Sequence, residues 1–173
     1  PKGSLDIDDA LSYEYSDNTY RIGIHIADVS FWFSKINLYK YIKDKFFTIY
    51  CPNKKFNIFP NVLSDHLFSL KAKQDRLALS LFIYLDENHN IIHYNIQKSI
   101  INVNKNMTYE QANNKINKKS GNIYELYKLS KLFFKEKEYD NYDSHNMVEK
   151  YMLLANKYIS EYLILFKKKF PLR

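Results

Sequence analysis

A row of apolar side chains, repeated every three or four positions, dominates the last third of the chain and limits the folds open to it. The row runs through Met147, Tyr151, Leu154, Ala155, Tyr158, Tyr162 and Leu165. This period matches the turn of an α-helix and predicts a helix of about six turns with one apolar face. A helix of this kind needs a second apolar layer to cover that face.

The first third of the chain predicts that layer as a β-hairpin. Apolar and polar residues alternate from Leu11 to Ser16, and Ser16-Asp17-Asn18 is a turn signal. The segment from Tyr20 to Val29 predicts a second strand, because Ile22, Ile24 and Ile26 fall on one face. The opposite face of this strand carries Arg21, Gly23, His25 and Ala27.

Further elements follow along the chain. Helical character is expected at Leu38–Phe47 and Leu63–Leu70, and strands are expected at Phe47–Tyr50, Leu77–Leu85 and Ile91–Val103. Thr108 predicts a helix start because Gln111 can complete a capping box. A helix pattern runs from Ile123 to Phe134, and Glu136–Asn146 is expected to be a linker. The predicted fold class is α+β, a mixed or antiparallel sheet flanked by helices.

The composition excludes several classes of protein. Only three residues are glycine and none lies near another, so no glycine-rich phosphate loop is present. The single cysteine, Cys51, excludes an internal disulfide and a thiolate zinc site. No apolar run approaches the ~20 residues that span a bilayer, so no membrane association is expected.

The net charge of +7 is weak evidence for nucleic-acid binding. Of the 26 basic residues only Arg21, Arg76 and Arg173 are arginine, and the excess of lysine beside isoleucine, asparagine and tyrosine is typical of a codon bias towards A and T.

The run Asp6-Ile7-Asp8-Asp9 is the densest charge feature of the chain. In an extended segment Asp6 and Asp8 project to one side, and Asp9 turns away unless the backbone bends. Three adjacent carboxylates repel one another unless a cation or a basic partner neutralises them. The alternatives are therefore an exposed acidic turn and a site for Mg²⁺ or Mn²⁺, both of which prefer oxygen ligands.

An EF-hand calcium loop can be excluded by position. Counted from Asp6, the fifth position is Ala10, where an oxygen ligand is needed, and the sixth is Leu11, where glycine is required. A magnesium site that acts on phosphodiesters remains compatible with the sequence.

Several blocks in order resemble the catalytic domain of the ribonuclease II family, the RNB domain. They are Gly3–Leu11, Gly23–Ser30, Tyr50, Phe59–Pro60, Leu63–Leu70, Asp75–Ala78, Met107–Tyr109 and Val148–Asn156. The residues in several blocks resemble the eukaryotic exosome-nuclease branch of the family more than its bacterial members. Residues 111–146 carry almost none of the resemblance.

The resemblance implies a hydrolytic 3′→5′ exoribonuclease that releases nucleoside 5′-monophosphates with Mg²⁺, or alternatively Mn²⁺. Asp6, Asp8 and Asp9 match three of the four metal-binding aspartates of the family, and Asp8 and Asp9 match its catalytic residues. The fourth aspartate would fall one residue before Pro1, and a family arginine would fall after Arg173. Residues 1–173 are therefore expected to form part of an RNB catalytic domain.

Three further positions are implied to contact RNA. Tyr50 matches a tyrosine that stacks on the 3′-terminal base, Tyr109 matches a second RNA-contacting tyrosine, and Glu149 matches a glutamate near the substrate end. The implied partners are single-stranded RNA and an exosome-like complex, and the implied location is inside the cell, in the nucleus, the cytoplasm or both.

One alternative to this function stays open. The alternative function is a catalytically silent RNB-like module that binds RNA, in which the acidic cluster serves folding. Other polar residues are interpreted as structural: His25 as a strand residue rather than a general base, Asp28 as an acid that fixes the adjoining turn, and Arg76 as the partner of an acid.

Overall fold

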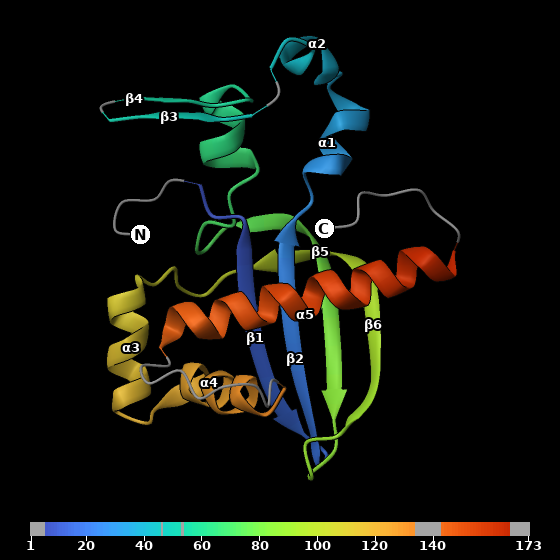
Figure 1. The fold of residues 1–173 in the computed structure, drawn as a ribbon, viewed down its shortest axis with the longest axis vertical. Helices are drawn as coiled ribbons and strands as arrows, with labels where there is room; N and C mark the ends of the chain where they lie inside the picture. Colours follow the sequence, from blue (N-terminus) through green and yellow to red (C-terminus); the bar gives the residue numbers. More distant parts are fainter. Residues whose placement is uncertain (1–5, 46, 53, 134–142, 167–173) are drawn as a thin grey trace.

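The computed structural model of the chain describes residues 6–45, 47–52, 54–133 and 143–166. Its main sheet is antiparallel, with the strand order β1-β2-β5-β6 (Figure 1). These strands are β1 (Asp9–Ser16), β2 (Thr19–Ala27), β5 (Asp75–Leu85) and β6 (Ile91–Asn102). The sheet predicted from the alternating segments is thus confirmed in its antiparallel form.

Three helices pack together beside this sheet: the longest of them crosses one face of the strands, and the first lies to the side of the sheet, past β1 (Figure 1). They are α3 (Tyr109–Asn117), α4 (Gly121–Phe133) and α5 (Ser144–Leu165). The apolar row predicted for the last third of the chain is the buried side of α5 in its first four turns, whereas Tyr162 and Leu165 are exposed.

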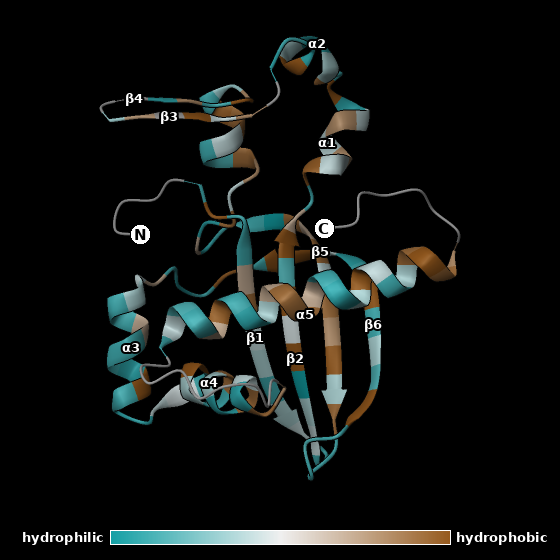
Figure 2. Ribbon diagram, viewed as in Figure 1, coloured by the Kyte–Doolittle hydropathy of each residue, from teal (hydrophilic) through white to brown (hydrophobic). Residues whose placement is uncertain are grey.

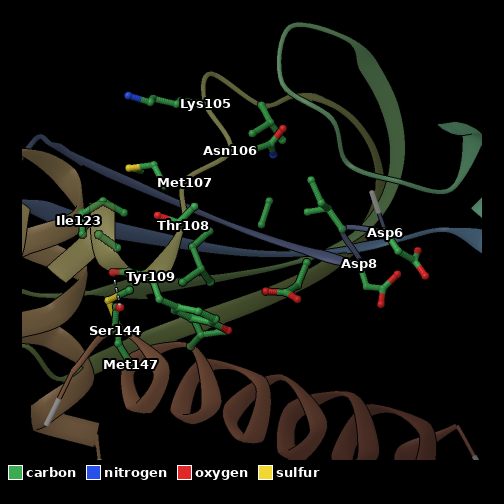
Figure 3. A pocket seen from close by; sticks show the side chains of 17 residues that line it. Asp6, Asp8, Lys105, Asn106, Met107, Thr108, Tyr109, Ile123, Ser144 and Met147 are labelled. Carbon is green, nitrogen blue, oxygen red and sulfur yellow. Dashed lines mark hydrogen bonds between the residues drawn. The ribbon is translucent and has the colours of Figure 1, made fainter. Parts of the chain in front are cut away.

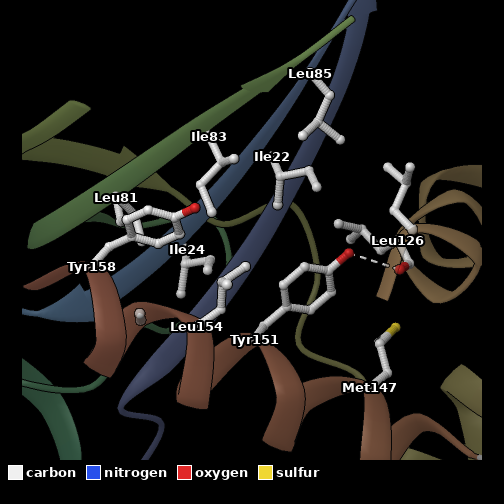
Figure 4. Packing of buried hydrophobic residues seen from close by; sticks show 12 residues of the cluster. Ile22, Ile24, Leu81, Ile83, Leu85, Leu126, Met147, Tyr151, Leu154 and Tyr158 are labelled. Atoms are coloured by element: carbon white, nitrogen blue, oxygen red, sulfur yellow. Dashed lines mark hydrogen bonds between the residues drawn. The ribbon is translucent and has the colours of Figure 1, made fainter. Parts of the chain in front are cut away.

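The core fills the space between α5, α4 and the two central strands (Figure 4). Ile22 and Ile24 of β2 are fully buried there, and Figure 2 shows apolar, brown segments in both β2 and β5 beneath α5. The hydroxyl group of Tyr151 donates a hydrogen bond of 2.8 Å to the carbonyl oxygen of Leu126, which joins α5 to α4 inside the core. Burial of apolar side chains on this scale is the main force that holds α5 against the sheet.

The turn between β1 and β2 follows from its sequence. Asp17 and Asn18 both have positive φ angles, 49° and 57°, which is the backbone of a type I′ hairpin turn. Aspartate and asparagine tolerate this conformation better than other residues with a side chain. The hairpin register then pairs Ser16 with Thr19 and Asp9 with Ile26.

A second group of elements lies beyond one end of the main sheet (Figure 1). It comprises α1 (Val29–Lys35), α2 (Tyr39–Ile42), the two-stranded hairpin of β3 (Ile49–Cys51) and β4 (Lys54–Phe56), and a π-helical turn, η1 (Leu63–Leu67). No helix in the described ranges is both long and apolar enough to cross a membrane.

Several sequence predictions were wrong in their boundaries. The strand predicted at Phe47–Tyr50 is Ile49–Cys51, and the helical turn predicted at Leu63–Leu70 ends at Leu67. The strand predicted to reach Val29 ends at Ala27, because Asp28 begins α1. The helix predicted at Leu38–Phe47 is limited to Tyr39–Ile42. The predicted linker 136–146 is helical from Ser144 onward, and its residues 136–142 lie outside the described residues.

Candidate active site

The segment before β1, which carries the acidic residues, is held by three backbone interactions. The Ile7 N–H donates to Ser69 Oγ at 3.1 Å, and the Ile7 carbonyl oxygen accepts from the Leu70 N–H at 2.8 Å. The Asp8 carbonyl oxygen accepts from the Ala27 N–H at 2.9 Å. These bonds fix an extended backbone, so that side chains two residues apart point to the same side.

Asp6 and Asp8 point the same way from this segment (Figure 3), as their spacing predicts. Asp8 keeps an exposed edge, but the surrounding protein withdraws part of its hydration. The pKa of Asp8 is raised, first by this burial, then by the negative charges of Asp6 and Asp9 and by a hydrogen bond with Asp6, while Lys55 opposes the shift. A carboxylate pair of this kind favours a cation beside it.

A cleft of about 450 Å³ begins at the acidic segment and is bounded on its other side by α3, α4 and the start of α5 (Figure 3). Its lining includes Asp6, Asp8, Asp9, Lys105, Asn106, Tyr109, Ile123, Ser144, Met147 and Val148. All three predicted acids and Tyr109 therefore meet in one cleft, although more than ninety residues separate them in the sequence from Tyr109.

Tyr109 is positioned by its place at the start of α3 and by contacts with the start of α5. It is the first residue of α3, which begins with the predicted capping box of Thr108 and Gln111. The Ser144 hydroxyl donates to the Tyr109 carbonyl oxygen at 3.2 Å, and the ring stacks on His145. The tyrosine ring therefore has a fixed place at the cleft wall.

The charges around Tyr109 link it to the acids. The pKa of Tyr109 is raised, first by burial of its hydroxyl group and then by the negative charges of Asp9 and Asp143. The pKa of Asp9 is raised by burial as well. Asp9 and Tyr109 are both partly buried and line the same cleft, which accounts for the direction of both shifts.

The residues at the cleft fit one side of a hard-cation site. Asp6 and Asp8 offer neighbouring carboxylate oxygens, the ligands that Mg²⁺ and Mn²⁺ prefer. Lys55 of β4 supplies a positive charge there, with its Nζ 2.9 Å from Asp6 Oδ2. Within the part of the chain that the structure describes, no three His, Cys, Asp or Glu side chains gather closely enough to enclose a metal ion.

The other two predicted RNA contacts stand apart from this cleft. The backbone of Tyr50 lies in β3, opposite Lys55 in the hairpin, and the Tyr50 side chain lies outside the described part of the chain. Glu149 is exposed on α5 and is not among the cleft residues, although its neighbour Val148 is.

Two cleft residues were not expected from the sequence. Lys105 and Asn106 lie in the connection between β6 and α3 and line the same cleft as the acids, although the Lys105 side chain points away from Asp6 and Asp8 (Figure 3). Asn106 braces this connection, because its Nδ2 donates to the Leu70 carbonyl oxygen at 3.0 Å and its Oδ1 accepts from the Ala72 N–H at 2.7 Å. The only signal in the sequence is their place two and three residues before Thr108, the cap of a predicted helix.

The structural interpretation of His25 is confirmed. His25 is buried in β2, where Nε2 lies 3.0 Å from Ser12 Oγ and Nδ1 lies 2.7 Å from Ser80 Oγ. Its pKa is lowered from 6.5 to about 4, chiefly by burial and also by the positive charge of Arg21. A histidine held neutral between two hydroxyl groups stabilises the sheet and has no place in the cleft.

Asp28 and Arg76 gave different outcomes. Asp28 is structural as predicted, since its Oδ1 caps α1 by accepting from the Phe31 N–H at 3.0 Å. The acid partner predicted for Arg76 was wrong. Arg76 Nε instead donates to the carbonyl oxygens of Ser69 at 3.0 Å and His66 at 3.2 Å, in the segment where the chain turns from η1 to β5.

The fold and the acidic cleft define an α+β protein whose carboxylates lie at one end of an antiparallel sheet. The RNB domain model matches residues 1–138, and the chain belongs to the RNB domain family. It is 31% identical to ribonuclease R of Chlamydia pneumoniae, over 91% of this chain and 28% of that protein. It is also 31% identical to the human exosome complex exonuclease RRP44, over 90% of this chain and 20% of that protein.

Solved structures show the same fold. Mycoplasma genitalium RNase R in complex with ribose methylated single-stranded RNA matches 96% of this chain and 32% of its own, with a TM-score of 0.81 and 21% identity. Yeast Ssd1, described as a pseudonuclease, matches 73% of this chain and 16% of its own, with a TM-score of 0.63 and 21% identity. The chain thus spans between about a fifth and just over a quarter of the two curated relatives.

Proposed function

We propose that residues 1–173 form part of the catalytic domain of a Mg²⁺-dependent 3′→5′ exoribonuclease, which degrades single-stranded RNA to nucleoside 5′-monophosphates. The observation that carries this proposal is the cleft of an RNB-family chain in which Asp6, Asp8 and Asp9 face the same space as Tyr109. An aromatic ring and a carboxylate cluster in one cleft suit the base and the phosphate of a nucleotide, respectively.

Hydrolysis at this site would cleave the bond between phosphorus and the 3′ oxygen of the preceding nucleotide. Water adds its oxygen to the phosphorus, so the released nucleotide keeps a 5′-phosphate and the shortened RNA regains a 3′-hydroxyl group. A bound Mg²⁺ would supply positive charge that favours deprotonation of that water and balances the charge developing on the phosphate. We take Asp6, Asp8 and Asp9 as the residues that would hold the ion, with Asp8 and Asp9 closest to the reaction, although among the described residues the three carboxylates do not yet enclose a metal site.

RNA would be held mainly through contacts that do not depend on its sequence. Stacking of a base on Tyr109 or Tyr50 is worth about 1–3 kcal/mol, and every base offers a ring for it. Lys105 at the rim of the cleft would meet the phosphate backbone. Glu149 keeps its proposed place near the RNA, outside the cleft lining. We place this activity inside the cell, in the nucleus or the cytoplasm, with an exosome-like complex as a partner.

A catalytically silent RNA-binding module is the second candidate. It is supported by the structural similarity to yeast Ssd1, a pseudonuclease. If this chain is such a module, its cleft would bind RNA without cleaving it.

The variant Asp8→Asn separates the two candidates. With the intact protein, Mg²⁺ and a uniformly labelled single-stranded RNA, we expect the wild type to release labelled nucleoside 5′-monophosphates. Asp8→Asn should lose at least about a hundredfold of this rate while its RNA affinity stays within about threefold, because a ligand for the cation is lost but the aromatic contacts remain. The control Asp44→Asn, at an exposed site away from the cleft, should keep the wild-type rate.

Undiminished turnover by Asp8→Asn would refute the assignment of the metal site. No release of monophosphates by the wild type at any concentration of Mg²⁺ or Mn²⁺ would favour the silent module.

A further inference from the structure

Lys55 forms an ion pair with a carboxylate of the candidate active site. Its Nζ lies 2.9 Å from Asp6 Oδ2, and the two side chains are only 31% and 30% exposed. The two residues are 49 positions apart in the sequence. This contact therefore joins the β3–β4 hairpin to the acidic segment before β1.

The hairpin has little other support from a sheet. β3 and β4 pair only with each other, in a sheet separate from the main one, and an isolated two-stranded hairpin is marginally stable in water. Its apolar residues Ile49 and Phe56 are each 49% exposed, so burial contributes modestly to its position. The ion pair is accordingly one of the contacts that hold the hairpin beside the cleft.

The hairpin register connects this tether to a proposed RNA contact. Tyr50 lies directly opposite Lys55, between the pairs Ile49–Phe56 and Cys51–Lys54. The pairing of Tyr50 with Lys55 therefore places the Tyr50 backbone next to the residue that contacts Asp6.

We propose that Lys55 is a displaceable counter-ion of Asp6, which a divalent cation replaces when it binds to the carboxylates. This inference rests on the proposed function, because it takes Asp6 to be a metal ligand. The ammonium group and a divalent cation compete for the same oxygens, and the cation has the advantage of a second carboxylate, Asp8. Lys55 thus keeps the acidic pair neutralised until the cation arrives.

The competition has two reciprocal consequences. Lys55 weakens metal binding, since the ion pair must be broken first, and the metal loosens the hairpin, since Lys55 loses its partner. The Tyr50 strand would then be free to adjust to the terminal base only when the metal is in place. Lys55 acts here as a positioning residue.

Direct binding of Mn²⁺ to the intact protein tests the first consequence, with the electron paramagnetic resonance signal of free Mn²⁺ as the readout. We expect Lys55→Met to bind Mn²⁺ about three- to tenfold more tightly than the wild type, which is the range that a partly exposed ion pair can supply. Lys55→Arg, which keeps the charge, should bind like the wild type. Lys43→Met removes a charge from an exposed site after α2 and should also leave the affinity unchanged.

Hydrogen exchange of the hairpin amides tests the second consequence. Mg²⁺ should speed exchange in residues 49–56 of the wild type, whereas in Lys55→Met exchange should be fast with or without Mg²⁺. Circular dichroism and an unchanged exchange rate in β5 would verify that Lys55→Met is folded.

The outcomes distinguish this inference from the function on which it rests. Equal Mn²⁺ affinity of the wild type and Lys55→Met would overturn the role of Lys55 and leave the metal-dependent nuclease intact. No Mn²⁺ binding by the wild type would remove both.

Discussion

The ring of Tyr109 stacks on the ring of His145, with centroids 3.4 Å apart and planes inclined by 21°. His145 lies in the first turn of α5, where its Nδ1 is 3.5 Å from Asp143 Oδ2, and Asp143 is the residue that caps this helix. The aromatic wall of the cleft is thus supported by the beginning of the helix that covers the sheet.

This support predicts the effect of removing the imidazole ring. His145→Ala should leave Tyr109 less well ordered and weaken the binding of single-stranded RNA by about three- to tenfold, since an aromatic pair contributes about 0.5–1.5 kcal/mol. Fluorescence anisotropy with a labelled oligonucleotide would measure the change. The matched control is His93→Ala, at an exposed residue of β6. Equal loss of affinity in both variants would show that the stack has no particular role.

The buried imidazole of His25 predicts a pH dependence of stability. Its pKa is about 4 in the folded protein, against 6.5 in the unfolded chain. As the pH falls below 6.5, the imidazole becomes protonated in the unfolded chain but stays neutral in the folded protein until about pH 4. The free energy of unfolding therefore decreases as the pH falls from 6.5 to about 4. The decrease should amount to about 2–3 kcal/mol from this one group.

Urea unfolding between pH 4 and pH 7 would measure this dependence. His25→Gln should flatten the decrease, because glutamine has no proton to gain, whereas His93→Gln should retain the wild-type slope. If the wild type and His25→Gln lose stability in parallel over this range, His25 is not the residue responsible.

Gly23 lies against the same buried histidine and tolerates no side chain. A methyl group at this position would meet Ser12 Oγ and would lie 2.7 Å from His25 Nε2. Gly23→Ala should therefore lower the free energy of unfolding by about 1–3 kcal/mol through overpacking. Ser12→Gly in the same chain should recover part of this loss, and a cost that is the same with and without Ser12 would contradict the proposed clash.

The periodicity of the sequence predicts helices whose signal is local, as in α5 and α3. The apolar row from Met147 to Tyr158, and the Thr108–Gln111 capping box, predicted their helices because the signal lies within a few neighbouring residues. Asp143 and Asn146 form a second capping box, which was overlooked inside a segment that is polar throughout.

Long-range contacts of the site could not be predicted in the same way. The spacing of Asp6 and Asp8 indicated a common side because they share one extended segment. The contact of Asp6 with Lys55, and the cleft that the acids share with Lys105, depend instead on the path of the chain in space. Arg76 illustrates the same limit, since its partners are carbonyl oxygens, which every residue has and no sequence pattern reveals.

Asp28 lies between the end of β2 in the main sheet and the start of α1, and it gives a prediction about this junction. Burial alone would raise the pKa of Asp28, but the hydrogen bonds from Ser30 and the Phe31 N–H and the charge of Lys98 outweigh it, so the pKa is lowered. The ionised carboxylate is therefore the form that the fold uses to cap α1. The Asp28 carboxylate has a lower pKa in the folded protein than in the unfolded chain. Its contribution to the free energy of unfolding is therefore present at neutral pH and is lost as the pH falls through the titration range of an aspartate.

Asp28→Ala should lower the free energy of unfolding at pH 7 by about 1–2 kcal/mol, the usual effect of removing a capping side chain. Asp28→Asn should lose less, because an amide oxygen can still accept from the Phe31 N–H. Urea denaturation would measure both, with Asp44→Ala as the control at an exposed aspartate. Equal stability of Asp28→Ala and Asp44→Ala would mean that α1 is held in place by its packing and that the cap contributes little.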